Sequence, residues 1–158
     1  MCWSIPSASG REKITCVMKK LFLRENDKLC LTRIEIDAKY FSRIADKSND
    51  TEDSLTNDFG VTIHQAILSV SALEELTVKL EKWLDVPFEF YQNISGDNYQ
   101  MLRINVGKND GLITSLEKPA LTFDVNLSSL RKSTVSYVVD QSCLHIFHEE
   151  LKRFLAGL

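Results

Sequence analysis

The sequence predicts an α+β fold in which a curved antiparallel β-sheet carries two main helices on one face. Segments with apolar residues at alternate positions follow one another directly, which favours an antiparallel sheet over βαβ units. Residues 120–127 and 133–139 keep a strict period of two, which is typical of a sheet with one buried and one hydrated face. Two longer segments, ending near residues 85 and 156, repeat apolar residues at helical spacing.

The first 17 residues differ from the rest of the chain. Trp3 and Pro6 stand among Ser and Thr residues, and no apolar run is long enough for a signal peptide. The segment Met18-Lys19-Lys20-Leu21 has the character of a natural start of translation. We therefore expect residues 1–17 to be a disordered extension or a start-site artefact, followed by a single α+β domain over residues 18–158.

Residues 19–24 and 28–37 are predicted to form a β-hairpin. Leucines at nearly alternate positions support both strands, and Glu25-Asn26-Asp27 supplies the turn. The alternation slips at Thr32-Arg33, which indicates a β-bulge. Residues 38–45 fit either a helical turn or an extended segment.

Residues 46–58 are predicted to be a surface loop with an excess of negative charge. One lysine stands there against five acidic residues: Asp46, Asp50, Glu52, Asp53 and Asp58. Such a loop is either an ordinary solvated connection or an electrostatic attractant for a basic protein partner.

A strand over residues 61–70 is expected next, followed by a helix. His64 in the strand has no suitably spaced partner and is interpreted as a structural histidine. Ser71-Ala72-Leu73-Glu74 has the pattern of a capping box, in which the serine hydroxyl and the glutamate satisfy free backbone N–H groups. The leucines that follow share one helical face with Trp83, so we expect Trp83 to lie in the core.

Three more strands are expected before the regular pair: 88–92, 99–106 and a shorter one at 111–115. Glu89 and Tyr91 fall on the hydrated face of the first of them because they alternate with phenylalanines. Asp140 is expected to cap the final helix, and Gly157 is expected to mark its end.

The composition is that of an ordinary globular protein without a dominant charge. The net charge is −3 and the pI about 5.6, which argue against a general nucleic-acid binder and against binding to anionic membranes. No apolar run is long enough to span a membrane. The cysteines form no CxxC pair and no disulfide framework, so reduced thiols in the cytoplasm fit best: Cys2, Cys16, Cys30 and Cys143.

His145, His148 and Glu149 form the only cluster in the sequence with a metal-like grouping. Zinc peptidases place two histidines four residues apart with a glutamate between them, whereas here the spacing is three and the glutamate follows. A carboxylate from elsewhere would still allow a small metal-dependent hydrolase that uses His145 and His148; otherwise they line a solvated helix edge.

Cys143 is the one candidate nucleophile near these histidines. It lies in the first turn of the predicted helix, where the helix dipole would lower the pKa of a thiol. No third group is evident to orient a Cys/His pair, and neither a glycine-rich phosphate loop nor GxSxG is present. We therefore predict no catalytic residue and no cofactor.

Four features follow one another between about residue 70 and residue 156. The first is a Leu/Trp helix, Leu73-x-x-Leu76-x-x-x-Leu80-x-x-Trp83-Leu84, and the second is an aromatic strand, Phe88-Glu89-Phe90. The third is a pair of strands, Leu121-Thr122-Phe123-Asp124-Val125 and Val135-Ser136-Tyr137-Val138-Val139. The fourth is a terminal helix, Leu144-x-x-Phe147-x-x-x-Leu151-x-x-Phe154-Leu155. Together they resemble the WapI-type immunity proteins of bacterial contact-dependent toxin systems. The chain departs from that family in its N-terminal extension and in lacking the proline that often closes the last helix.

The resemblance implies a non-enzymatic cytoplasmic inhibitor that binds and blocks a toxin domain. Acidic and aromatic surface groups are the expected contacts with a basic toxin: Asp50, Glu52, Asp53, Asp58, Glu89 and Tyr91. The alternatives are the metal-dependent hydrolase and an adaptor or chaperone, which would expose an apolar patch or a self-associating sheet edge.

Overall fold

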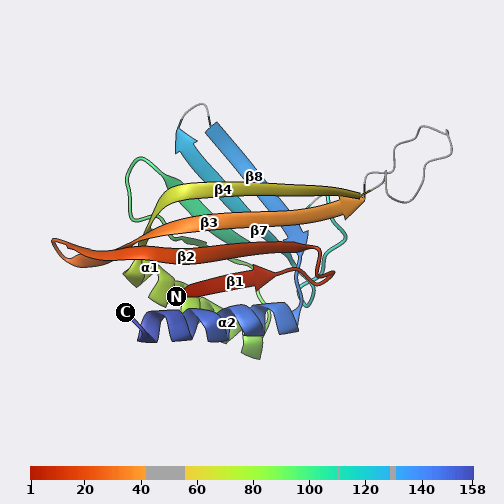
Figure 1. Ribbon diagram of the computed structural model, residues 1–158. Helices are drawn as coiled ribbons and strands as arrows, with labels where there is room; N and C mark the ends of the chain where they lie inside the picture. The colour runs from red at the N-terminus through yellow and green to blue at the C-terminus, as the bar shows by residue number, and fades with distance from the viewer. Residues whose placement is uncertain (42–55, 110, 129–130) are drawn as a thin grey trace.

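The computed structural model describes residues 1–41, 56–109, 111–128 and 131–158 (Figure 1). Sheet A consists, in order of pairing, of the antiparallel strands β1 (Cys2–Pro6), β2 (Glu12–Arg24), β3 (Asp27–Phe41) and β4 (Thr56–Ser69). Sheet B consists in the same way of β5 (Phe90–Asn93), β6 (Met101–Gly107), β7 (Ala120–Ser128) and β8 (Arg131–Val138). Helix α1 (Val70–Asp85) follows sheet A in the chain, and helix α2 (Gln141–Ala156) follows sheet B.

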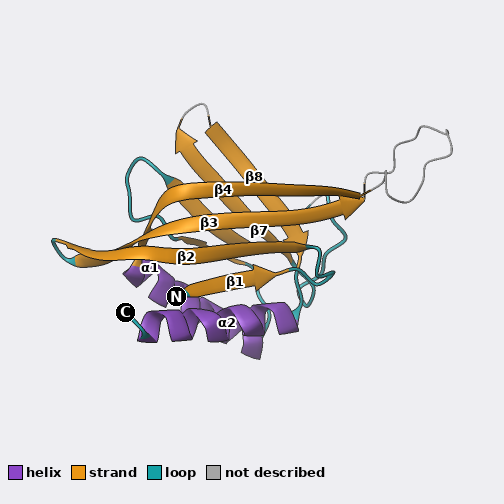
Figure 2. Ribbon diagram, in the orientation of Figure 1, coloured by secondary structure: helices purple, strands orange, loops and turns teal. Residues whose placement is uncertain are grey.

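The two sheets lie one behind the other with their strands crossing obliquely (Figure 1). Figure 2 shows both helices together along one side of the sheets, where they contact each other. Buried residues from both sheets and both helices form one hydrophobic core, so the predicted α+β class is confirmed. The strands form two sheets instead of one, because α1 separates them after β4; an isolated bridge between Leu68 and Ser95 connects the sheets.

Residues 1–17 form β1 and the first part of β2, which contribute side chains to this core, so the expectation of a disordered extension is wrong. β1 pairs with the first half of β2. Four side chains of these two strands have no exposed surface, and they occupy alternate positions: Trp3, Ile5, Ile14 and Cys16. The ring of Trp3 lies 5.2 Å from the ring of Phe147 in α2. The alternation of apolar residues, and not the abundance of serine, determines the structure of this segment.

Helix α2 covers the outer edge of β1. The carboxylate of Glu150 accepts hydrogen bonds from the backbone N and the Oγ of Ser4, both at 2.6 Å. The hydroxyl of Tyr137 in β8 donates to the carbonyl of Ile5, and beyond the end of β1 the Ala8 N donates to the Val138 carbonyl at 2.9 Å. The edge strand is therefore bonded to both α2 and sheet B instead of being open to another chain.

The hairpin of β2 and β3 is confirmed, together with its bulge. The pairing register of β3 with β4 shifts between Thr32 and Ile34, where the sequence predicts the slip. Glu25 in the turn has a φ of 44°, in the left-handed region. β3 continues to Phe41, so residues 38–41 are extended and not helical, because pairing with β4 satisfies their backbone groups.

Helix α1 begins two residues earlier than the predicted capping box. Its N-cap is Ser69, whose Oγ accepts a hydrogen bond from the Ala72 N at 3.3 Å, so the prediction of Ser71 as the cap is wrong. The same Oγ donates to Asp27 Oδ2 at 2.6 Å. Ser71 Oγ also donates to Asp27 Oδ2, at 3.3 Å, so this carboxylate of β3 binds both serines at the start of the helix. Trp83 is buried, as predicted.

Helix α2 follows the prediction at both ends. Asp140 accepts a hydrogen bond from the Cys143 N at 3.0 Å, and Gly157 is the C-cap. The predicted strand at 111–115 is wrong, since the structure has turns and loop there. The side chain of Ile113 is 100% exposed, so nothing in the core requires an extended segment at this position.

Candidate functional site

The outer face of sheet B, opposite the core, brings polar and aromatic side chains together. Along β6, Leu102, Ile104 and Val106 are buried, so the residues between them lie on the other side of the sheet. The pairing of β6 with β5 and β7, and of β7 with β8, places polar residues of those strands beside the outward residues of β6. We call the following set the outer face of sheet B: Tyr91, Asn93, Met101, Arg103, Asn105, Thr122, Asp124, Asn126, Thr134 and Ser136.

Asp124 is the centre of a hydrogen-bond network on this face. Its Oδ2 accepts from Asn105 Nδ2 at 2.8 Å and lies 3.6 Å from Arg103 Nη2. Its Oδ1 accepts from Thr134 Oγ1 at 3.0 Å. Three strands are thereby tied across their outer side, which holds the side chains of this face in defined positions.

Tyr91 lies between two cations. The Lys79 Nζ of α1 is 5.8 Å from the centre of the Tyr91 ring, and the Arg103 Cζ of β6 is 5.3 Å from it. Lys79 also donates to the Tyr91 carbonyl at 2.8 Å. These contacts hold an aromatic ring that is still 57% exposed, so the ring is oriented before any partner arrives.

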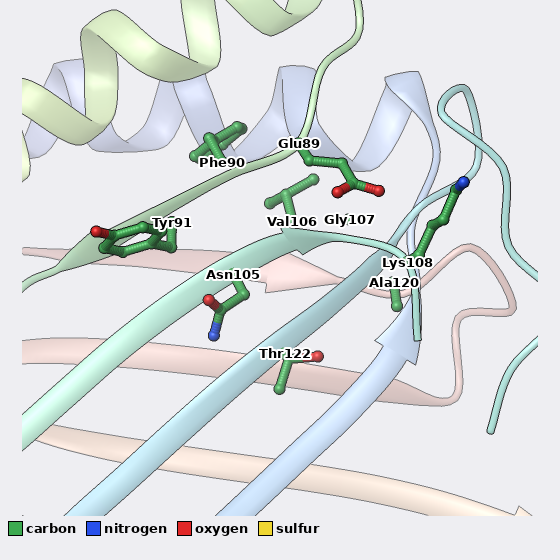
Figure 3. Close-up of a pocket in the computed structure, with 9 residues that line it drawn as sticks. All are labelled: Glu89, Phe90, Tyr91, Asn105, Val106, Gly107, Lys108, Ala120 and Thr122. Carbon is green, nitrogen blue, oxygen red and sulfur yellow. The ribbon is translucent and has the colours of Figure 1, made fainter. Parts of the chain in front are cut away.

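A hollow of about 260 Å³ lies at one end of the outer face (Figure 3). Its walls come from the segment before β5 and from β5, β6 and β7: Glu89, Phe90, Tyr91, Asn105, Val106, Gly107, Lys108, Ala120 and Thr122. A Cβ atom placed on Gly107 would lie 3.2 Å from Glu89 Cγ, so the Glu89 side chain runs across this glycine. The backbone of β6 therefore forms part of the floor under the Glu89 carboxylate.

A second hollow, of about 420 Å³, lies at the other end of the same face. Asn93, Met101 and Asn126 of the outer face help to line it, together with the loop between β5 and β6. Tyr99 in that loop is 87% exposed, and Met101 is 51% exposed. Aromatic residues, methionine and arginine are the types enriched at protein interfaces, and this face presents all three.

Of the residues predicted as partner contacts, Glu89 and Tyr91 are both exposed and line the same hollow. Asp50, Glu52 and Asp53 lie outside the described residues. Asp58 belongs to β4, paired with Lys39 of β3, so its placement in a loop is wrong. Glu89 directly precedes β5 instead of lying within the predicted strand over residues 88–92, yet the structure brings it together with Tyr91.

The histidine pair of α2 is divided between two environments. His145 is exposed, whereas His148 is only 6% exposed, with its Nδ1 3.6 Å from Glu149 Oε1. Within the described ranges, no group of three His, Cys, Asp or Glu side chains is arranged to hold a metal ion. Cys143 is buried, and burial raises the pKa of its thiol. The expected lowering of that pKa by the helix dipole is therefore wrong, because desolvation of the thiolate is the larger effect.

Sequence reasoning did not single out Arg103, Asn105 or Asp124 as members of the site. The alternation of β6 contained a signal for the first two, since they stand between the apolar residues of that strand. Their proximity to Asp124 depends on register with β7, which a local pattern does not contain.

Comparison with protein-family models and with curated proteins found no match to this chain. Among the described residues, neither helix has the length and apolar character needed to cross a membrane.

Proposed function

We propose that this protein is a non-enzymatic binding protein that docks a protein partner on the outer face of sheet B. The observation that carries the proposal is the exposure of Tyr91, Tyr99 and Met101 beside Arg103 on a face that hydrogen bonds hold in place. Large side chains that lose little conformational freedom on binding supply most of the energy at protein interfaces.

In its specific form, the proposal is that the partner is a bacterial toxin domain and that the protein neutralises it by occlusion in the cytoplasm. The resemblance of residues 70–156 to immunity proteins supports this form, and so does the pair Glu89 and Tyr91 in one hollow. The acidic segment that contains Asp50, Glu52 and Asp53 would add electrostatic attraction to a basic partner and raise the association rate.

The experiment is affinity capture from the native organism, followed by calorimetry with the purified partner and an assay of its toxicity. Tyr91→Ala and Arg103→Ala should each weaken binding by about 2 kcal/mol or more, as expected for central interface residues. Leu23→Ala is the matched control, because Leu23 is 77% exposed in the hairpin of sheet A. Its effect should stay within about 0.5 kcal/mol.

Equal affinities for all three variants would refute the assignment of the outer face. A partner that binds with wild-type affinity but keeps its toxicity in the complex would leave a binding protein and remove the immunity function.

A further inference from the structure

Glu89 carries an unpaired carboxylate in a concave site. Among the described residues it makes no hydrogen bond or ion pair, unlike the carboxylates of Asp124 and Glu75. Asp124 is bonded to Asn105 and Thr134, and Glu75 of α1 accepts from Gln92 Nε2 at 3.1 Å. The acceptor capacity of Glu89 is therefore available to a group that enters the hollow from outside.

Apart from Lys108, the polar side chains that line the hollow with Glu89 are Tyr91, Asn105 and Thr122. Asn105 donates one of its two Nδ2 hydrogens to Asp124, and in Figure 3 the amide oxygen lies on the side of β5. The Thr122 hydroxyl shares a hydrogen bond of 2.9 Å with Ser136. A carboxylate and an amide oxygen beside an aromatic ring suit a ligand that has only donors and carries a positive charge.

From these contacts we infer that the hollow receives the guanidinium group of an arginine side chain from the protein partner, an inference that rests on the proposed function. A guanidinium can bond a carboxylate through two parallel N–H groups and still donate to Asn105, whereas an ammonium acts as a point charge. The volume of about 260 Å³ suits the end of a side chain and is below the range of about 300–1,000 Å³ typical of small-molecule sites.

Gly107 positions Glu89 for this role. Because a Cβ at residue 107 would lie 3.2 Å from Glu89 Cγ and 3.4 Å from its Cδ, a larger residue would displace the carboxylate by a few tenths of an ångström. Glu89 is exposed and able to move, so Gly107→Ala should alter the site and leave the fold intact.

Lys108 lies at the rim of the hollow without an ion pair to Glu89. Its ammonium group repels an incoming cation and should lower the affinity for arginine. Lys108→Gln is therefore expected to bind arginine more tightly than the wild type, and the gain should shrink at high salt because screening weakens the repulsion.

The test is an NMR titration of the 15N-labelled protein with Nα-acetyl-arginine amide, which needs no partner. Saturable shifts are expected at the Gly107 amide and at the side-chain amide of Asn105. Glu89→Gln should reduce affinity about tenfold, the equivalent of 1.4 kcal/mol, and Gly107→Ala should also reduce it. Glu81→Gln, an exposed acid on α1, is the matched control and should bind as the wild type does.

Equal binding of Nα-acetyl-citrulline amide, which has the same shape without the charge, would overturn the inference. So would equal binding of the lysine amide, or an unchanged affinity in Glu89→Gln. If arginine fails to bind while Tyr91→Ala still abolishes capture of the partner, the proposed function stands and the guanidinium site is wrong. If arginine binds at Glu89 and capture is insensitive to Tyr91, the site stands and the docking face is wrong.

Discussion

Replacing Trp3 by alanine should remove a large share of the stability of the protein, although the residue is third in the chain. Its side chain is completely buried and its ring contacts the ring of Phe147 across the junction of β1 and α2. The substitution therefore deletes an indole from the shared core and separates the N-terminal strand from the C-terminal helix.

The expected cost follows from the burial of the ring. Truncation of a buried aromatic side chain to alanine costs about 3–5 kcal/mol, and the contact between two aromatic rings contributes about 0.5–1.5 kcal/mol beyond area burial. Against a total stability of roughly 5–15 kcal/mol for a single domain, a loss of about 4 kcal/mol would leave the variant marginally folded. Trp3→Phe keeps a ring beside Phe147 and should lose considerably less.

Urea unfolding followed by far-UV circular dichroism measures the effect. Tryptophan fluorescence is unsuitable because the chain has two tryptophans and the variant loses one. The midpoint should fall with little change in the m-value. Tyr99→Ala is the control, since it truncates an aromatic residue that is 87% exposed, and it should change stability by less than about 0.5 kcal/mol. Similar, small losses for Trp3→Ala and Tyr99→Ala would refute the placement of β1 in the core.

Three further predictions concern polar groups and thiols. Glu150→Ala should cost about 1.5–3 kcal/mol in urea unfolding, because it leaves the N–H of Ser4 without its charged acceptor; a loss below 0.5 kcal/mol would contradict the role of this contact. Asp140→Ala should cost about 0.5–2 kcal/mol at pH 7. Hydrogen bonds from Ser142 and from the Cys143 N lower the pKa of Asp140 below its ordinary value of 3.8, so its contribution is complete above that value. The difference in the free energy of unfolding between the wild type and Asp140→Ala should therefore narrow as the pH falls through the lowered pKa. A difference that grows would refute the role of Asp140 as the cap. Ellman's reagent at pH 8 should modify Cys2 rapidly in the native protein, whereas the buried thiols should react only on unfolding: Cys16, with a pKa raised to about 12, Cys30, with a pKa raised to about 11, and Cys143.

The parts of the fold that the sequence predicts well are those encoded in short patterns. The strands at 120–127 and 133–139 differ from β7 and β8 by one or two residues, because a strict period of two leaves little choice of phase. The cap at Asp140 is equally local, since the residue and its N–H partner are three positions apart.

The errors arise where distant residues decide between local alternatives. Ser69 and Ser71 are both able to cap α1, and Ser69 is the cap because it is the last residue of β4, whose length depends on pairing with β3. The division into two sheets depends on which strands pair, whereas a period of two indicates only which side chains share a face. The N-terminal segment is a different case, because its apolar residues alternate along the sequence although its composition is rich in serine.

The candidate site combines both kinds of information. Exposure of Glu89 and Tyr91 follows from the alternation around them, whereas the pairing of Arg103 with Asp124 follows from the register of β6 and β7. A shift of one residue in that register would turn Arg103 inward and expose Leu102, so burial of the apolar face of β6 also fixes which residues lie outside. The core thus specifies the composition of the outer face without depending on its side chains. Substitutions at Tyr91 or Glu89 can for that reason test binding with little change in stability, which makes the partner experiments interpretable.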